Sequence, residues 1–205
     1  IKWWVEEFID QKVGLVLKCN IKSNTLIDHH HVQKSLKSIL DKYPDRKCKV
    51  YLLHGDLSSG QMTWLYTNPK IKSLICVSHG EGYGLPLFEA AREGLPIISI
   101  GWSGQLDFLC HDGKNYFTEV DYTMQKVQQE AVWPGVIEAD SMWAFADQGS
   151  YKMQLKRFKK NWSKAKKQAT KLQSLINEKF SDEKLYKDFC DAILSDENEE
   201  DMVIL

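Results

Sequence analysis

Short apolar runs alternate with amphipathic segments through the first 120 residues of the chain. Four of these runs are continuous enough for strands that are buried on both faces, at residues 13–17, 48–53, 73–77 and 96–100. Segments with helical spacing lie between them, at residues 28–40, 61–66 and 85–93. A shorter fifth strand is expected at residues 115–118. This alternation predicts an α/β fold with a doubly wound parallel sheet.

The pattern changes after about residue 120. It predicts a helix over residues 122–132, a turn at 133–135 and irregular chain over 137–149. One apolar stripe then predicts a single long helix over residues 151–180, through Leu155, Phe158, Trp162, Ala165, Ala169, Leu172 and Ile176. A last helix is expected over 182–194. The predicted organisation is a doubly wound domain over residues 1–150, a C-terminal helical extension over 151–195 and an acidic tail over 196–205.

Composition and charge remove several classes of function. Hydrophobic residues make up 43% of the chain and charged residues 27%, as in ordinary globular domains. A net charge of −1 argues against binding of nucleic acid through bulk electrostatics. No apolar run reaches the length of a membrane span. Five scattered cysteines without a C-x-x-C pair indicate reduced thiols, as in a cytoplasmic protein, and give no zinc-ligand spacing.

Other features each have a plain interpretation and a sharper one. Nine Lys or Arg and no acid lie between residues 152 and 171, which indicates a solvated face, or contact with anionic lipid at a membrane surface or with a missing domain. The triplet 29–31 is interpreted as exposed helix histidines, because no acid or Cys lies at metal-ligand spacing. Five tryptophans are interpreted as packing residues and not as a sugar platform: Trp3, Trp4, Trp133, Trp143 and Trp162. The chain begins without Met, so it is expected to be the back half of a longer protein.

Candidate chemistry gathers in the loop at residues 78–84, between a predicted strand and a helix. Ligands of doubly wound sheets bind beyond the carboxyl ends of the strands, where this loop lies. Gly80, Gly82 and Gly84 allow close approach of backbone amides to a ligand. The helix that follows has Pro86 in its first turn, and its N-terminus favours an anion such as a diphosphate.

Two glutamates sharpen this interpretation. Glu81 lies in the loop, and Glu89 lies in the helix after seven intervening residues. A carboxylate accepts two hydroxyls at once, which suits a sugar or a ribose diol. The alternative for Glu89 is a solvent-facing helix residue.

These residues resemble the E-x7-E signature of retaining GT-B glycosyltransferases of the group 1 type. Residues 94–98 are similar to the family's G-x-P-V-[IV] strand. Residues 101–107, followed by Asp112-Gly113, look like its G-G-x-x-E loop and the D-G after it, with Asp107 in place of the loop glutamate. The resemblance covers roughly residues 13–118.

The resemblance implies the family's donor-binding C-terminal domain, a Rossmann-like domain for a nucleotide sugar. The implied reaction transfers a glycosyl group from a nucleoside-diphosphate sugar with retention and without a metal ion or other cofactor. The acceptor would bind to an N-terminal domain that this sequence lacks. The closing helices resemble the family's C-terminal helices, so the last helix would pack on the long helix or on that missing domain.

Roles follow by position from the resemblance. Glu81 would contact the donor sugar nearest the reacting centre, and Glu89 would bind the ribose hydroxyls. Backbone amides for the sugar and diphosphate would come from Gly82, Tyr83, Gly84 and Leu85.

Basic and pocket residues follow in the same way. Lys18 or Lys22, after the first strand, would neutralise the leaving diphosphate. Gly104 would let the chain pass close to the phosphates. The base pocket would be built around His54, Asp56 and Leu57.

Two other functions remain open on the sequence. One is a nucleotide-sugar-binding or structural protein of this fold that has no turnover. The other is an epimerase or dehydrogenase on the same sheet, which predicts a Gly-rich turn after the first strand, where this chain has Lys18-Cys19-Asn20.

Overall fold

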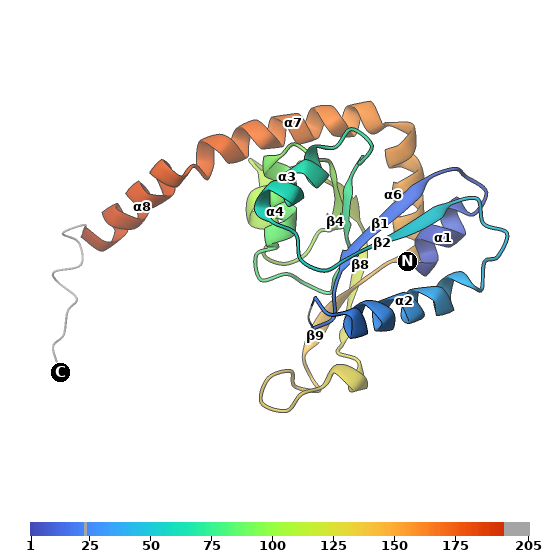
Figure 1. Cartoon of the computed structure of the whole chain (residues 1–205). Coiled ribbons are helices and arrows are strands. Elements are labelled where there is room, and N and C mark those ends of the chain that lie inside the picture. The colour runs from blue at the N-terminus through green and yellow to red at the C-terminus, as the bar shows by residue number, and fades with distance from the viewer. Residues whose placement is uncertain (23, 195–205) are drawn as a thin grey trace.

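The computed structural model describes residues 1–22 and 24–194 (Figure 1). Its first part holds helix α1 (Lys2–Phe8), strand β1 (Gly14–Cys19), helix α2 (Leu26–Leu40) and strand β2 (Lys49–His54). β1 and β2 pair in parallel over their full length. The Thr25 hydroxyl caps α2 by accepting the Asp28 backbone N–H at 3.3 Å, and the helix buries Leu36 and Leu40.

A second parallel sheet has the strand order β3–β4–β7. Its strands are β3 (Leu74–Cys76), β4 (Ile97–Ile100) and β7 (Thr118–Val120). Helix α3 (Ser59–Thr67) leads from β2 to this sheet. The connections within the sheet contain helices α4 (Leu85–Arg92) and α5 (Leu106–Leu109) and the short hairpin β5 (Cys110–His111)–β6 (Lys114–Asn115). The central strand β4 is buried at every residue, as expected of a continuous apolar run in a parallel sheet.

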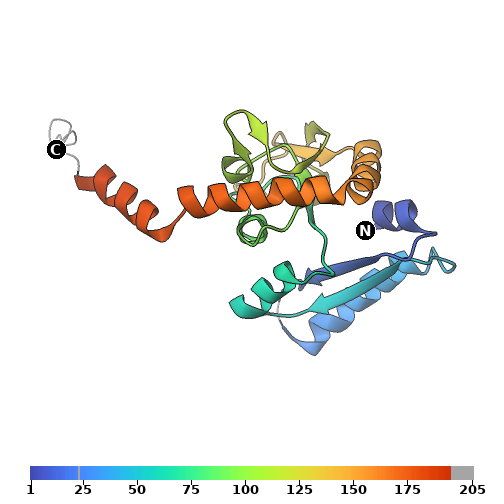
Figure 2. The same ribbon diagram turned by 90° about the horizontal axis from the view of Figure 1, so that it is seen from above.

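The chain is therefore a mixed α/β protein with parallel sheets, as the alternating pattern predicts. Within residues 1–22 and 24–194, the strands of the parallel pairs form two sheets, and β1 and β3 are not hydrogen-bonded to each other. Figure 2 shows β1, β2 and α2 together as one layer, apart from α7 (Trp162–Lys179) and the elements beside it. The fifth parallel strand begins at Thr118, the last residue of the expected segment 115–118, because Lys114 and Asn115 pair in the β5–β6 hairpin.

The prediction for residues 122–149 is wrong in two places. Residues 122–126 form strand β8 (Tyr122–Lys126) in place of a helix, and the segment expected to be irregular contains strand β9 (Met142–Ala146). The two strands pair in an antiparallel hairpin. A 3-10 turn (Gln129–Ala131) follows β8. The expected turn at 133–135 is confirmed, since the Trp133 carbonyl accepts the backbone N–H groups of Val136 and Ile137.

The long helix is two helices, α6 (Gln148–Lys160) and α7, that meet at Asn161. The apolar stripe itself is confirmed, because its members are buried or half-buried along both helices. α6 packs beside α1, with the rings of Trp3 and Tyr151 5.9 Å apart. α7 packs on α4, and Leu172 and Ile176 share a core cluster with Leu87.

Helix α8 (Asp182–Leu194) extends away from the rest of the chain (Figure 1). None of its residues is buried, so within the described residues it does not pack on the long helix, which was one of the two expected arrangements. The acidic tail expected at 196–205 lies outside the described residues. Along residues 1–22 and 24–194, no helix combines the length and the apolar character that a membrane span requires.

Part of the basic stripe at 152–171 is used inside the chain. Lys152 pairs with Glu6 at 2.6 Å, and Lys156 pairs with Glu7 at 3.3 Å. The Lys166 ammonium donates to the Gly94 carbonyl at 2.5 Å. These contacts hold α6 to α1 and α7 to the end of α4.

Candidate functional site

The loop between β3 and α4 ends in a left-handed turn at Gly84. Its φ of 87° is a conformation that favours glycine, and it sets the start of α4 with Pro86 in the first turn. The helix N-terminus therefore opens beyond the carboxyl end of β3. This is the end of a parallel sheet at which ligands bind.

The Glu81 carboxylate is held at this end of β3 by short-range partners. The Ser78 hydroxyl donates to its Oε1 at 2.7 Å, and the Cys76 thiol lies 3.5 Å from the same oxygen. Burial raises the pKa of the Cys76 thiol, so at neutral pH the sulfur carries its proton and can donate. Glu81 itself is half-buried, with one oxygen engaged by these groups.

The loop after β4 is locked onto the Glu81 backbone. The Ser103 hydroxyl accepts the Glu81 N–H at 3.1 Å and donates to the Glu81 carbonyl at 2.7 Å. The Gly104 N–H donates to the same carbonyl at 3.0 Å. Ser103 has a φ of 83°, which is unusual for a residue other than glycine and indicates a strained turn.

Gly104 is required here by the close approach of the two loops. A Cβ atom at this position would lie 1.9 Å from the Gly82 carbonyl oxygen, a backbone atom that cannot move aside alone. The resemblance implies that Gly104 lets the chain pass close to phosphates. The structure gives it a contact with the loop that carries Glu81, and Glu81 and Gly82 therefore depend on it.

Glu89 lies on α4 beside Tyr66. The Tyr66 hydroxyl donates to Glu89 Oε2 at 3.4 Å, and the carboxylate is otherwise on the exposed side of the helix. Burial of the ring, followed by the nearby Glu89 charge, raises the pKa of Tyr66 to about 12.

His79 joins the same loop to the β8–β9 hairpin. Its Nδ1 lies 2.8 Å from the Ala144 carbonyl, and its backbone carbonyl accepts the Ala144 N–H at 3.3 Å. The ring stacks on Trp143 with centroids 5.1 Å apart. A segment distant in the sequence thus fixes the entry to the loop.

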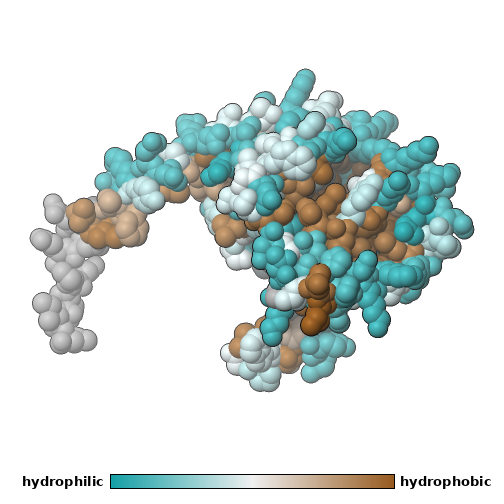
Figure 3. Space-filling view, viewed as in Figure 1, coloured by the Kyte–Doolittle hydropathy of each residue, from teal (hydrophilic) through white to brown (hydrophobic). Residues whose placement is uncertain are grey.

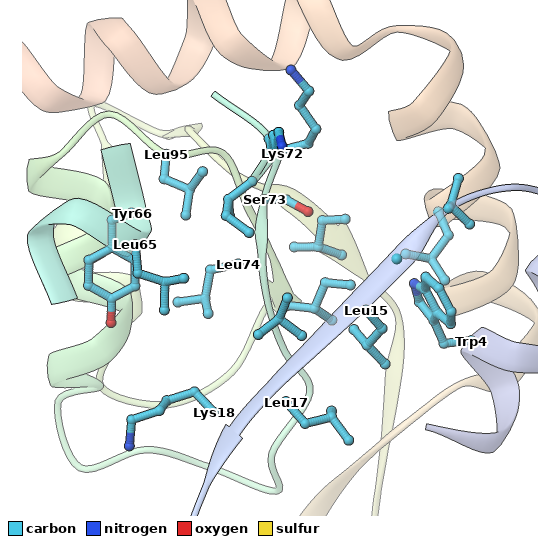
Figure 4. A pocket seen from close by; sticks show the side chains of 18 of the residues that line it. Trp4, Leu15, Leu17, Lys18, Leu65, Tyr66, Lys72, Ser73, Leu74 and Leu95 are labelled. Atoms are coloured by element: carbon cyan, nitrogen blue, oxygen red, sulfur yellow. The ribbon is translucent and has the colours of Figure 1, made fainter. Parts of the chain in front are cut away.

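An apolar cavity of about 1210 Å³ lies between β1 and β3. On the face of the molecule that Figure 3 shows, apolar surface gathers in the middle, between α7 and α2. Three of the predicted site residues line the cavity: Lys18, Asp56 and Leu57. Tyr66 and Pro86 line it too, so the first turn of α4 borders the space that Lys18 enters. Figure 4 shows the Lys18 side chain and the Tyr66 hydroxyl at the same end of the cavity.

The loop after β1 is organised by Asp28. Its Oδ2 accepts the backbone N–H groups of Ile21 and Lys22 at 3.0 and 3.2 Å. The same oxygen lies 3.4 Å from Nε2 of His54, and both side chains are buried. His54 therefore faces the start of α2 and does not line the cavity, whereas the Lys22 residue is exposed.

The remaining predicted residues divide between core and surface. The Tyr83 ring packs on Phe88 and Phe108, with centroids 5.6 and 5.2 Å away. Leu85 is exposed at the start of α4. In this arrangement Tyr83 and Leu85 can both contribute backbone amides, while the Tyr83 side chain anchors the loop to Phe88 and Phe108.

The structure thus brings together two groups of predicted residues. One is the interlocked pair of loops with Glu81, Gly82, Gly84 and Gly104, and the other is the cavity wall with Lys18, Asp56 and Leu57. Tyr66 links the cavity wall to Glu89 on α4, because it lines the cavity and its hydroxyl donates to the Glu89 carboxylate. Sequence reasoning assigns no role to Tyr66, Ser78, His79 or Ser103, and the one available signal was the position of two serines inside the Gly-rich loops.

Among residues 1–22 and 24–194, no group of three or more His, Cys, Asp or Glu side chains is arranged to hold a metal ion. In the histidine triplet, the ring of His29 meets the ring of His54 edge-on at 5.1 Å.

Comparison with known proteins gives no family. No protein-family model matches the chain, and no curated protein matches its sequence.

Proposed function

We propose that this chain binds a nucleoside-diphosphate sugar and is the donor-binding half of a retaining glycosyltransferase of the GT-B type. The observation that carries the proposal is the interlocking of the two loops, which holds the Glu81 carboxylate at the carboxyl end of β3 beside the N-terminus of α4. Loops that present a carboxylate and backbone amides together suit a ligand with both hydroxyls and phosphates.

Each part of such a ligand has a candidate partner. The α4 N-terminus and the amides of Gly82 and Gly84 suit the diphosphate. Lys18, on the cavity wall, suits the same charge. Glu89 suits the ribose diol, since Tyr66 leaves the second carboxylate oxygen for hydroxyl donors.

In the proposed reaction, the bond between the anomeric carbon and the diphosphate oxygen breaks and its electron pair leaves with the diphosphate. The anomeric carbon forms a bond to an acceptor hydroxyl on the same face, and the hydroxyl proton passes to the leaving group. Lys18 stabilises the charge that develops on the diphosphate. The acceptor is bound by a further domain, so this chain alone is expected to bind the donor without turnover.

The proposal extends to the fold. A doubly wound sheet with the order β2–β1–β3–β4–β7 requires β1 and β3 to pair across the cavity. In Figure 4, β1 from Leu15 to Lys18 and the segment from Lys72 to Leu74, which leads into β3, run in the same general direction, which supports such an order. Slower hydrogen exchange of the β1 amides when nucleotide is added is the measurement that tests it.

A thermal-shift panel tests the binding proposal. The panel contains UDP, GDP, ADP and their sugars, with uridine, guanosine and adenosine as controls that lack the diphosphate. At a concentration near 100 times Kd, a ligand stabilises the folded state by about 2.7 kcal/mol. For a chain of 205 residues this raises Tm by roughly 5–10 °C. A panel in which no diphosphate raises Tm at millimolar concentration contradicts the proposal.

A further inference from the structure

Trp102 stands on the strained loop that locks the site, next to Glu81. It immediately precedes Ser103, the residue with a φ of 83° whose hydroxyl binds the Glu81 backbone. A Cβ atom at Gly80 would lie 3.8 Å from the Trp102 indole nitrogen, so the indole lies against Gly80. Gly80 is the residue before Glu81, and the indole is therefore fixed beside the carboxylate-bearing loop.

The indole is supported on one side and open on another. Its ring lies 6.0 Å from the ring of Tyr122 on β8, and 39% of the residue remains exposed. The loop after β4, which carries Trp102, is restrained, because Ser103 and Gly104 make three hydrogen bonds to the Glu81 backbone. An indole that is partly open to solvent thus lies on a loop whose backbone is bound to the backbone of Glu81.

We propose that Trp102 is a specificity-determining residue that packs against the glycosyl group of the bound nucleotide sugar. This inference rests on the proposed function. A pyranose ring has an apolar C–H face and a polar rim of hydroxyls. The open face of Trp102 covers the apolar face, while Glu81 accepts hydroxyls on the rim.

A contact of Trp102 with the glycosyl group would affect the affinity for the nucleotide sugar and not the affinity for the nucleoside diphosphate. A residue that touches only the glycosyl group contributes to the affinity of the nucleotide sugar and leaves the affinity of the nucleoside diphosphate unchanged. A residue that only supports the fold would change both affinities together. The ratio of the two affinities is therefore the quantity to measure.

Isothermal titration calorimetry with UDP, UDP-glucose, GDP and GDP-mannose makes this test. For the pair that binds the wild-type chain, Trp102→Ala is expected to weaken the nucleotide sugar about three- to tenfold. The nucleoside diphosphate should bind within twofold of wild type. Trp102→Phe, which keeps an aromatic face, should stay near wild type, and Trp102→Leu, which keeps apolar volume without that face, should behave like Trp102→Ala.

Trp133→Ala is the matched control, because Trp133 is 65% exposed at the tip of the hairpin. It should leave both affinities unchanged. Equal losses for sugar and diphosphate, no loss in Trp102→Ala, or full affinity in Trp102→Leu would each overturn the role of Trp102 while the proposed function stands. If the wild-type chain binds none of these four compounds and no member of the ADP pair of the thermal-shift panel, the proposed function fails, and the role of Trp102 fails with it.

Discussion

Gly104→Ala is expected to lower the free energy of unfolding by about 3 kcal/mol, the upper end of the range for overpacking. The added Cβ would lie 1.9 Å from the Gly82 carbonyl oxygen. The Cβ position is fixed by the Gly104 backbone, and the oxygen belongs to the Gly82 backbone, so relief requires the two loops to separate and the Gly104–Glu81 hydrogen bond to break. Urea denaturation followed by circular dichroism measures the change, and nucleotide binding should be lost with it.

Gly82→Ala is the control within the same pair of loops. A Cβ at Gly82 meets nothing within 4 Å, and its φ lies outside the left-handed region. We expect its stability to be unchanged or raised by up to about 1 kcal/mol, because alanine restricts the unfolded chain. Equal stability of the two variants would show that the loops do not interlock as described.

Stability is expected to fall steeply between pH 10 and pH 12. Tyr66 and Tyr151 are both buried, and burial raises the pKa of each to about 12. Below pH 10 both tyrosines carry their protons in the folded and the unfolded chain. Above pH 10 the unfolded chain loses these protons first, so unfolding is favoured by about 1.4 kcal/mol per group per pH unit. The stabilisation is complete below pH 10 and lost as the pH approaches 12.

Urea midpoints at pH 9 and pH 11 measure this loss. In the double variant Tyr66→Phe and Tyr151→Phe the difference between the two midpoints should shrink, because the other titrating groups are common to both proteins. Tyr186→Phe, at a tyrosine that is 71% exposed, should keep the wild-type difference. An unchanged difference in the double variant would contradict the burial of these two hydroxyls.

The local pattern of apolar and polar residues is enough to predict most helices and strands before residue 120. The run Ile97–Ile100 is apolar at three of four positions and becomes the fully buried central strand. Gly84 and Pro86 mark the start of α4 for reasons of backbone conformation alone. Such elements depend on neighbours in the chain, which a sequence shows.

Partners distant in the sequence decide the elements that the pattern misses. Residues 122–132 contain helix-forming Gln, Lys, Glu and Ala, yet β8 forms because Met142–Ala146 supplies a partner strand. The sequence does not predict the break between α6 and α7, because the apolar stripe continues across Asn161. At the break, the Asn161 side chain and backbone N–H both donate to the Arg157 carbonyl.

The residues of the candidate site also fall into those that the local sequence indicates and those that only tertiary packing brings in. Glu81, Glu89 and the glycines stand out because their chemistry and spacing are visible in one stretch of chain. Tyr66 and Ser103 reach them only through tertiary packing. The buried pair of His54 and Asp28 is a further case, since nothing local indicates that this histidine faces α2.

Calorimetry of nucleoside diphosphate binding to Glu89→Ala tests the central claim most directly. Hydrogen bonds to a charged group contribute about 1.5–3 kcal/mol, so loss of the ribose contact should weaken UDP or GDP at least about tenfold. Glu93→Ala, at the C-terminal cap of α4 and four residues after Glu89, is the matched control and should bind as the wild type does. Circular dichroism should show the same fold in all three proteins. An affinity of Glu89→Ala equal to that of the wild type would contradict a nucleotide sugar at this site.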